Sequence, residues 1–146
     1  MVSLGNRELI DIIVDEFEAS IEVTAHNELT VMHYAAQSYS GYISILMLVR
    51  KHAFSVNVRD KIQATPLHFA ILKKEVWNVE LLIKFGADVD AQDYLGHTPL
   101  HIAVMRTSQD PDGFRDYKRI IKELLFAGAD KNLKSKAEKT PHDLLE

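Results

Sequence analysis

Thr65-Pro66-Leu67-His68-Phe69-Ala70 decides the fold, because the same pattern returns 33 residues later as Thr98-Pro99-Leu100-His101-Ile102-Ala103. A looser copy precedes them, Thr30-Val31-Met32-His33-Tyr34-Ala35, and a fourth begins near the end, Thr140-Pro141-His142-Asp143-Leu144. A second phrase stands between the copies, as Gly86-Ala87-Asp88 and Gly128-Ala129-Asp130. Self-similarity at a fixed period is the signature of a protein built from stacked repeats.

Each copy of the pattern predicts the start of a short helix. The hydroxyl of Thr65 or Thr98 suits a helix N-cap, where it accepts a hydrogen bond from the first turn. Pro66 and Pro99 then fall at the first helical position, where the missing N–H costs nothing. The alanine that closes each copy leaves room for the next repeat to approach closely.

A second, longer helix follows in each repeat. Its apolar residues recur with a helical period, as Ile45, Leu48, Val49; Val79, Leu82, Ile83; and Ile120, Ile121, Leu124, Leu125. Gly86 and Gly128 stand where such a helix ends in a left-handed turn. Ala53 takes that place in the first repeat, so we expect a strained or reshaped helix exit there.

A hairpin loop separates each second helix from the next copy of the pattern. Asp60 and Asp93 begin the two clearest loops, and Gly96 supplies the left-handed turn of the second. Gln63 and Glu138 hold the matching positions in the other loops, which predicts the same turn at a higher conformational cost.

Together these motifs resemble the ankyrin-repeat family. The resemblance implies an all-α fold with short β-hairpin loops, in which helix-turn-helix repeats stack into an α-solenoid. We expect a single domain over residues 1–146. Its expected units are a partial N-terminal repeat (1–29), repeat 1 (30–64), repeat 2 (65–97), repeat 3 (98–139) and a partial C-terminal repeat (140–146).

The copies are not evenly spaced. Thr30 to Thr65 is 35 residues and Thr98 to Thr140 is 42, so two extra residues fall near positions 39–41 and nine within 106–116. Both places lie between paired helices, where insertions are tolerated. Residues 8–17 match the second helix of a repeat whose first helix is reduced. Such cut-off repeats are poor caps, which favours a fragment of a longer protein over a small complete one.

Composition narrows the class of protein. At 146 residues and 16.6 kDa the chain fits one domain, and the absence of cysteine excludes disulfides and thiolate zinc sites. No apolar run reaches the roughly 18 residues that a membrane span needs. Asp11, Asp15 and Glu16 interrupt any signal-peptide core. We therefore expect a cytoplasmic or nuclear protein without direct membrane insertion.

The net charge of −4 conceals a gradient along the chain. Residues 1–30 carry a net charge of −6, whereas residues 118–139 carry +4. The two ends are either solvated charged caps or a means of steering a partner electrostatically. The basic end lacks the interleaved aromatic residues of nucleic-acid sites, so no nucleic acid is expected as a partner.

His33, His68 and His101 recur once per repeat. Neighbouring repeats lie about 10 Å apart, too far for these side chains to share one metal ion. The resemblance implies instead that they hydrogen-bond adjacent hairpins. No phosphate-binding loop or nucleophile-elbow pattern is present. We therefore expect no enzyme activity, no cofactor and no metal site.

The resemblance places partner binding on the hairpin tips and on the inner face of each repeat's first helix. Carried over by register, the expected partner-binding residues are Ile62, Leu72, Lys73, Tyr94, Leu95, His97, Met105 and Arg106. An apolar patch with an aromatic residue and a polar rim is typical of an interaction hot spot. Alternatively, the apolar tips merely pack on one another. Trp77 and Phe114 either pack together and fix the inserted loop, or form a second contact site on the convex side.

The leading hypothesis is a monomeric protein–protein interaction module that binds another protein. One alternative is a regulatory or substrate-recruiting segment of a larger enzyme or channel, such as a DHHC-type palmitoyltransferase. Another is a short mimic of the IκB-like inhibitors. The resemblance also places Asn57 and Asn132 where ankyrin repeats are often hydroxylated, and the residues leave that modification undecided.

Overall fold

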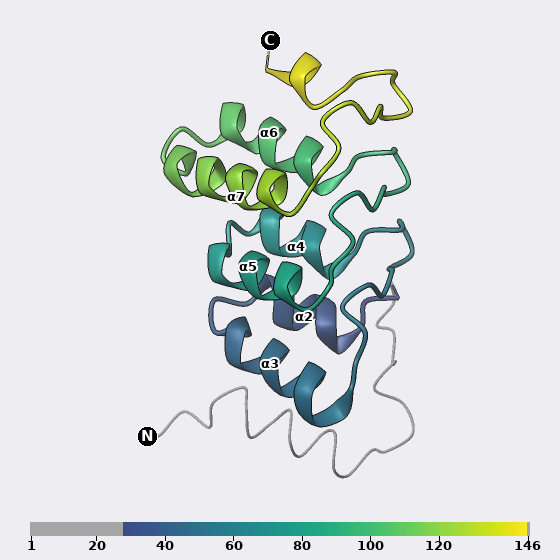
Figure 1. Ribbon diagram of the computed structural model, residues 1–146, viewed down its shortest axis with the longest axis vertical. Coiled ribbons are helices and arrows are strands. Elements are labelled where there is room, and N and C mark those ends of the chain that lie inside the picture. The colour runs from purple at the N-terminus through teal and green to yellow at the C-terminus, as the bar shows by residue number, and fades with distance from the viewer. Residues whose placement is uncertain (1–27, 146) are drawn as a thin grey trace.

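The computed structural model describes residues 28–145, so most of the expected N-terminal partial repeat lies outside the described residues. The described part contains six α-helices and one short 3-10 helix (Figure 1). In chain order they are α2 (Val31–Gln37), α3 (Gly41–His52), α4 (Pro66–Leu72), α5 (Val76–Lys84), α6 (Pro99–Gln109), α7 (Phe114–Phe126) and η1 (His142–Leu144).

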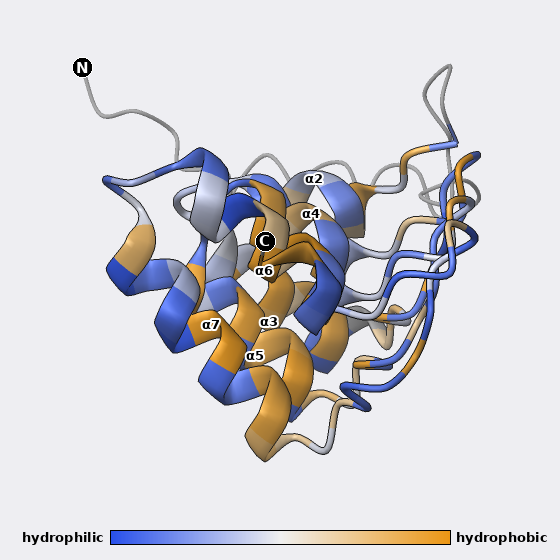
Figure 2. Cartoon of the chain, turned by 90° about the horizontal axis from the view of Figure 1, so that it is seen from above, coloured by the Kyte–Doolittle hydropathy of each residue, from blue (hydrophilic) through white to orange (hydrophobic). Residues whose placement is uncertain are grey.

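The helices form two parallel rows. Each pair, α2 with α3, α4 with α5 and α6 with α7, packs as a helical hairpin, and each helix also contacts its equivalent in the next repeat. Viewed along the stack, the inner row of α2, α4 and α6 lies above the outer row, with the loops projecting to one side of both (Figure 2). The expected all-α solenoid of stacked helix-turn-helix repeats is confirmed.

The projecting loops are narrow turns without assigned strands in the described region. Each closes through one backbone hydrogen bond at its base. The bonds are Asp60 N to Ala64 O (3.0 Å), Asp93 N to His97 O (3.0 Å) and Ser135 N to Lys139 O (2.8 Å). The expected β-hairpins are thus too short to build a ladder.

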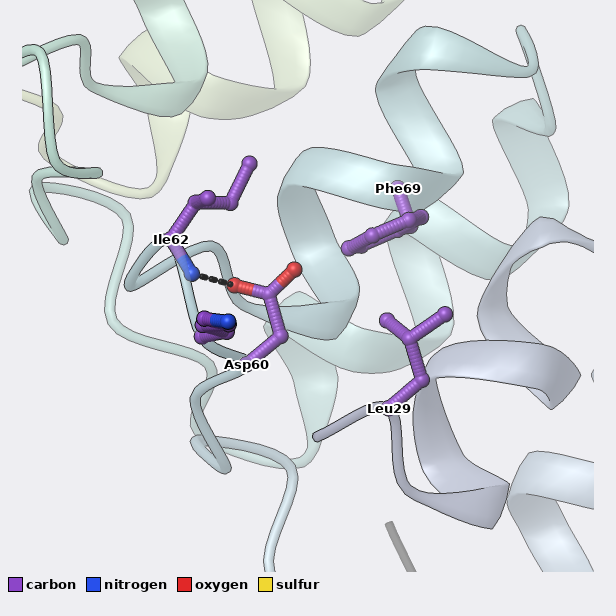
Figure 3. A pocket seen from close by; sticks show the side chains of 5 residues that line it. Leu29, Asp60, Ile62 and Phe69 are labelled. Atoms are coloured by element: carbon purple, nitrogen blue, oxygen red, sulfur yellow. Dashed lines mark hydrogen bonds between the residues drawn. The ribbon is translucent and has the colours of Figure 1, made fainter. Parts of the chain in front are cut away.

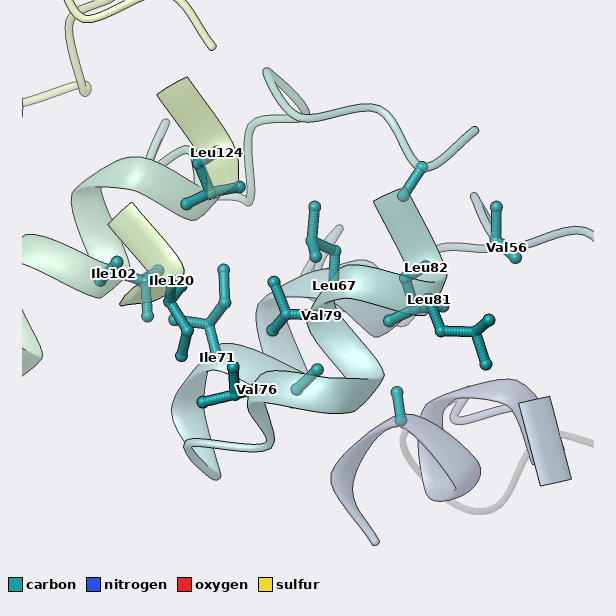
Figure 4. Close-up of a cluster of buried hydrophobic side chains, with 14 of the residues drawn as sticks. Val56, Leu67, Ile71, Val76, Val79, Leu81, Leu82, Ile102, Ile120 and Leu124 are labelled. Carbon is teal, nitrogen blue, oxygen red and sulfur yellow. The ribbon is translucent and has the colours of Figure 1, made fainter. Parts of the chain in front are cut away.

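The core runs continuously between the two helix rows (Figure 4). Leu67, Ile71, Val79, Leu82 and Leu124 are fully or almost fully buried within it. The alanines Ala36, Ala70 and Ala103 are completely buried as well, which agrees with the close approach that the repeated pattern predicts. Each repeat therefore completes its core only against its neighbour.

The predicted helix exits are confirmed. Gly86 and Gly128 have φ of 87° and 92°, and Ala53 adopts the same left-handed conformation at φ 54°. A side chain costs about 1 kcal/mol or more in this region of backbone space, so the exit of α3 is strained as expected.

The inserted residues lengthen helices more than they extend loops, which differs from the expected turn insertion. α4 and α5 have 7 and 9 residues, whereas α6 and α7 have 11 and 13. Eight of the nine extra residues therefore form one additional helical turn on each side of the connection. In repeat 1 the connection is as short as in repeat 2, and α3 is longer, with 12 residues. When inserted residues continue a helix, their backbone N–H and C=O groups hydrogen-bond within that helix, and no long loop is needed.

Of the two interpretations of Trp77 and Phe114, mutual packing finds no ring contact among the described residues, and a second contact site stays a prediction. The Trp77 ring lies 4.7 Å from the guanidinium of Arg119 on α7, and Arg119 also forms an ion pair with Glu80. Phe114 is half exposed at the start of α7 and shares no ring contact with Trp77 in the described region. Trp77 thus helps to join α5 to α7 through a cation–π contact.

Candidate functional site

An internal carboxylate shapes each of the first two described hairpin tips. Asp60 Oδ1 accepts hydrogen bonds from the backbone N–H groups of Ile62 (3.0 Å) and Ala64 (2.8 Å). Asp93 Oδ1 repeats this geometry one repeat later, with the N–H groups of Leu95 (2.9 Å) and His97 (2.8 Å). Because the carboxylate satisfies the backbone from inside the loop, the tip side chains project outward.

The tips are joined to one another by backbone hydrogen bonds. Tyr94 N donates to Ile62 O (2.8 Å), and Lys136 N donates to Leu95 O (2.9 Å) in the same register. Long side chains add a second link, since Arg59 donates to the carbonyl of Gln92 (2.8 Å) and Gln92 donates to Lys134 O (3.0 Å). The tips therefore form one edge of fixed geometry, and not three independent loops.

Seven of the eight predicted partner-binding residues fall into two rows. The tip row consists of Ile62, Tyr94 and Leu95, residues that are 51%, 55% and 42% exposed. The helix-end row consists of Leu72 and Lys73 at the C-terminal end of α4, and of Met105 and Arg106 about one turn before the end of α6. Since α4 rises about 1.5 Å per residue over seven residues, about 10 Å of inner helix separates the rows.

His97 belongs to neither row. It lies half-buried at the base of its loop, where its carbonyl accepts a hydrogen bond from His68 Nε2 (3.1 Å). Its ring nitrogen Nδ1 lies 3.8 Å from the carboxylate of Asp93. The structure thus places His97 among the contacts that hold adjacent repeats together.

A shallow pocket of about 310 Å³ opens between the tip row and the inner helices (Figure 3). Its walls are Leu29, Asp60, Lys61, Ile62 and Phe69. The predicted set missed Phe69, which packs edge-on against His33 of the preceding repeat at a centroid distance of 5.3 Å.

A sequence signal for Phe69 did exist. Phe69 is the variable residue of the repeated pattern, and Tyr34 and Ile102 hold the same position in the other copies. An apolar residue in all three copies, on the helix face that borders the loops, indicates a surface with apolar character.

The three histidines have the structural role that the resemblance implied. In each, the ring Nε2 bonds the carbonyl that ends the next hairpin loop, at Ala64 (3.1 Å), His97 (3.1 Å) and Lys139 (2.9 Å). The ring Nδ1 accepts the backbone N–H of its own N-cap threonine at 3.1–3.2 Å. Because a carbonyl only accepts, Nε2 carries the proton and the ring is neutral.

Burial lowers the pKa of His33, His68 and His101 below the ordinary value of 6.5, despite opposing hydrogen bonds to backbone carbonyls. The cause is desolvation, which penalises the charged imidazolium. A proton on Nδ1 would also oppose the threonine N–H that points at it. The neutral state is therefore built into the contacts between repeats.

The partial C-terminal repeat replaces the histidine with Asp143. Its carboxylate accepts from both the N–H and the hydroxyl of Thr140 at 2.8 Å, and these bonds lower the pKa of Asp143. A carboxylate has no proton to donate, so Asp143 reproduces the cap at the helix start but not the bond to a further hairpin.

Within residues 28–145, no group of three histidine, aspartate or glutamate side chains is placed to hold a metal ion. In the same region, no helix is both long and apolar enough to cross a membrane.

Comparison with known proteins agrees with the stacked helix-turn-helix repeats of the structure. A family model described as ankyrin repeats (three copies) matches residues 1–93 and 48–135. The chain is 35% identical over 71 residues to delta-latroinsectotoxin-Lt1a of Latrodectus tredecimguttatus. It is 36% identical over 64 residues to the transient receptor potential channel pyrexia of Drosophila melanogaster. These matches cover 49% and 44% of this chain but only 6% of each relative.

Proposed function

Because the chain belongs to the ankyrin-repeat family, we propose that it is a protein-interaction module that binds a partner protein across the concave face between hairpin tips and inner helices. This face is formed by the tip row, the helix-end row and the pocket between them. The module acts by binding and not by catalysis.

The exposed tip row is the observation that carries this proposal. Single exposed apolar residues are ordinary on protein surfaces, but Ile62, Tyr94 and Leu95 are held side by side along one edge. Their backbones are already fixed by bonds between loops, so binding costs little additional ordering entropy. A rigid row of an aromatic and two aliphatic side chains has the composition of a hot spot.

A second candidate follows from the lengths of the relatives. Since this chain spans about 6% of each of them, the same module is also suited to serve as a regulatory or recruiting segment of a larger protein, such as a channel. The partner face would be the same in that setting, and the host would carry the activity. Nothing in the comparisons favours a palmitoyltransferase or an inhibitor mimic among these hosts.

The test is a double substitution, Tyr94→Ala with Leu95→Ala, on a tagged chain used for affinity capture with quantitative mass spectrometry. Burial of these side chains contributes roughly 1.5–3 kcal/mol each, so affinity for a true partner should fall at least about tenfold. The matched control is Phe126→Ala, because Phe126 is 88% exposed on the outer row at the end of α7. A partner that is retained by the tip variant and lost by the Phe126 variant would assign binding to the opposite side.

A further inference from the structure

The concave face carries positive charge that the rest of the described chain does not neutralise. Lys61 stands at one hairpin tip and Lys136 at another, and Lys73 and Arg106 stand in the helix-end row. None of these four forms an ion pair within residues 28–145. Lys136 instead lies 5.5 Å from the ring centroid of Tyr94. This surplus is notable because the chain as a whole has a net charge of −4.

The acidic side chains of the same loops are used internally. The carboxylates of Asp60 and Asp93 accept backbone N–H groups inside their turns. Glu138 forms an ion pair with Lys134 at 3.3 Å, and the exposed carboxylates of Asp88 and Asp130 each accept a backbone N–H of their own loop. Glu28 is a further exposed acid. A surface whose cations lack ion-pair partners and whose loop carboxylates bond backbone N–H groups attracts negatively charged groups.

The apolar pocket adjoins these cations. Leu29, Ile62 and Phe69 surround it together with the internally bonded carboxylate of Asp60 (Figure 3), and Lys61 completes its lining. A pocket of about 310 Å³ has room for one large aliphatic or aromatic side chain. A carboxylate next to that side chain in a bound segment would meet the ammonium group of Lys61.

We propose that the partner contributes an acidic peptide segment, with one apolar anchor in the pocket of Leu29, Ile62 and Phe69 and with carboxylates facing Lys73 and Lys136. This inference rests on the proposed function, because it names the partner chemistry of the same face. A peptide fits better than a nucleic acid, since the pocket offers Leu29 and Ile62 beside the single ring of Phe69, and Tyr94 is the one aromatic side chain of the tip row. Proteins that bind single-stranded nucleic acid without sequence preference stack successive bases on several aromatic side chains.

The experiment is parallel selection from a phage-displayed library of random dodecapeptides. One target is the chain of residues 1–146, and the other is its Lys73→Glu, Lys136→Glu variant, in which both changed residues are exposed. The chain should enrich peptides with Asp or Glu flanking Leu, Ile or Phe, and the variant should lose the acidic preference. The strongest synthetic peptide should bind the variant at least tenfold more weakly. It should also lose affinity several-fold between 50 and 300 mM NaCl, because salt screens exposed charges.

A second pair of variants tests the pocket. Ile62→Ala should weaken the selected peptide at least threefold while the preference for acidic residues persists. Ile62 is half exposed, so this change spares the fold, and thermal unfolding checks that it does. Phe126→Ala is the matched control and should leave the affinity unchanged. An unchanged affinity for the Ile62 variant would overturn the assignment of the anchor to this pocket.

The other outcomes separate the two proposals. Enriched peptides without acidic bias, bound equally by the charge-reversed variant, would overturn this inference and leave the proposed function standing. No enrichment, or peptides that bind the Tyr94→Ala, Leu95→Ala chain normally, would count against the proposed function itself. If a 20-nucleotide oligo-dT bound more tightly than any selected peptide and lost affinity on charge reversal, the basic face would belong to nucleic acid instead.

Discussion

The hairpins at residues 93–97 and 135–139 share one backbone turn but maintain it by different means. In the first, Asp93 accepts two loop N–H groups and Gly96 takes the left-handed position at φ 77°. In the second, Ser135 replaces the aspartate, and Glu138 takes the left-handed position at φ 58°. The buried hydroxyl of Ser135 has no hydrogen-bond partner among the described residues.

Repeat 3 and the preceding loop hold the weaker hairpin in place. His101 Nε2 donates to Lys139 O (2.9 Å), Gln92 donates to Lys134 O (3.0 Å), and Lys136 N donates to Leu95 O (2.9 Å). A loop that lacks the aspartate and the glycine of its neighbour therefore still adopts the same turn when adjacent residues supply hydrogen bonds to its backbone. This is the nearest-neighbour coupling expected of a repeat protein.

The largest effect should come from His101→Ala. The change leaves the N–H of Thr98 and the carbonyl of Lys139 without partners and removes a fully buried ring. We expect a loss of about 2–4 kcal/mol in the free energy of unfolding, measured by urea denaturation followed by circular dichroism. Amide exchange should accelerate most in residues 130–145. The control is Asp143→Ala, an exposed cap that should cost about 1 kcal/mol or less; equal losses would mean that His101 does not hold the last hairpin.

Mild acid should weaken the contacts between repeats. Burial lowers the pKa of His33, His68 and His101. Near pH 6.5 these three histidines therefore bind protons in the unfolded chain but stay neutral in the folded chain. The free energy of unfolding is therefore highest above about pH 7, and it falls as the pH drops below 6.5. Each histidine contributes a slope of at most about 1.4 kcal/mol per pH unit. Urea unfolding at several pH values should give this slope. The His101→Ala chain should have a shallower one; a flat profile over this window would contradict the neutral state of the rings.

Asp93→Ser would give the well-formed hairpin the chemistry of the last one. A serine hydroxyl cannot accept both loop N–H groups as the carboxylate does, so we expect a loss of about 1–2 kcal/mol. The tip bond from Tyr94 to Ile62 should persist, which slowed amide exchange at Tyr94 would reveal. Wild-type stability would mean that neighbouring loops alone maintain this turn.

Ser135→Asp makes the opposite change and should have the smallest effect. The new carboxylate lies where Asp93 lies in its own loop, so it should accept the N–H groups of Ala137 and Lys139. We expect a gain of about 0.5–1 kcal/mol, read as a higher urea midpoint at an unchanged slope. Ser135→Ala is the control that removes only the unpaired hydroxyl. If the alanine variant gains as much as the aspartate variant, the missing acceptor is not what weakens this hairpin.

The sequence by itself determined the features that depend on local backbone chemistry. The threonine and proline at each helix start, the left-handed positions at Gly86, Ala53 and Gln63, and the register of the histidines all follow from contacts between residues close in the chain. Such contacts recur once per repeat, so the repetition itself reveals them. The tip row of Ile62, Tyr94 and Leu95 was identified in the same way, although its role in binding stays a prediction.

Only the tertiary structure decided the features that depend on packing between repeats. The inserted residues form additional helical turns in α6 and α7. Trp77 packs on Arg119, and Phe69 lines the pocket beside the tip row. Residues as far apart in the chain as Trp77 and Arg119 become neighbours only when one repeat stacks on the next. A repeated local pattern fixes how each unit folds, whereas the side chains that differ between units find their partners through stacking.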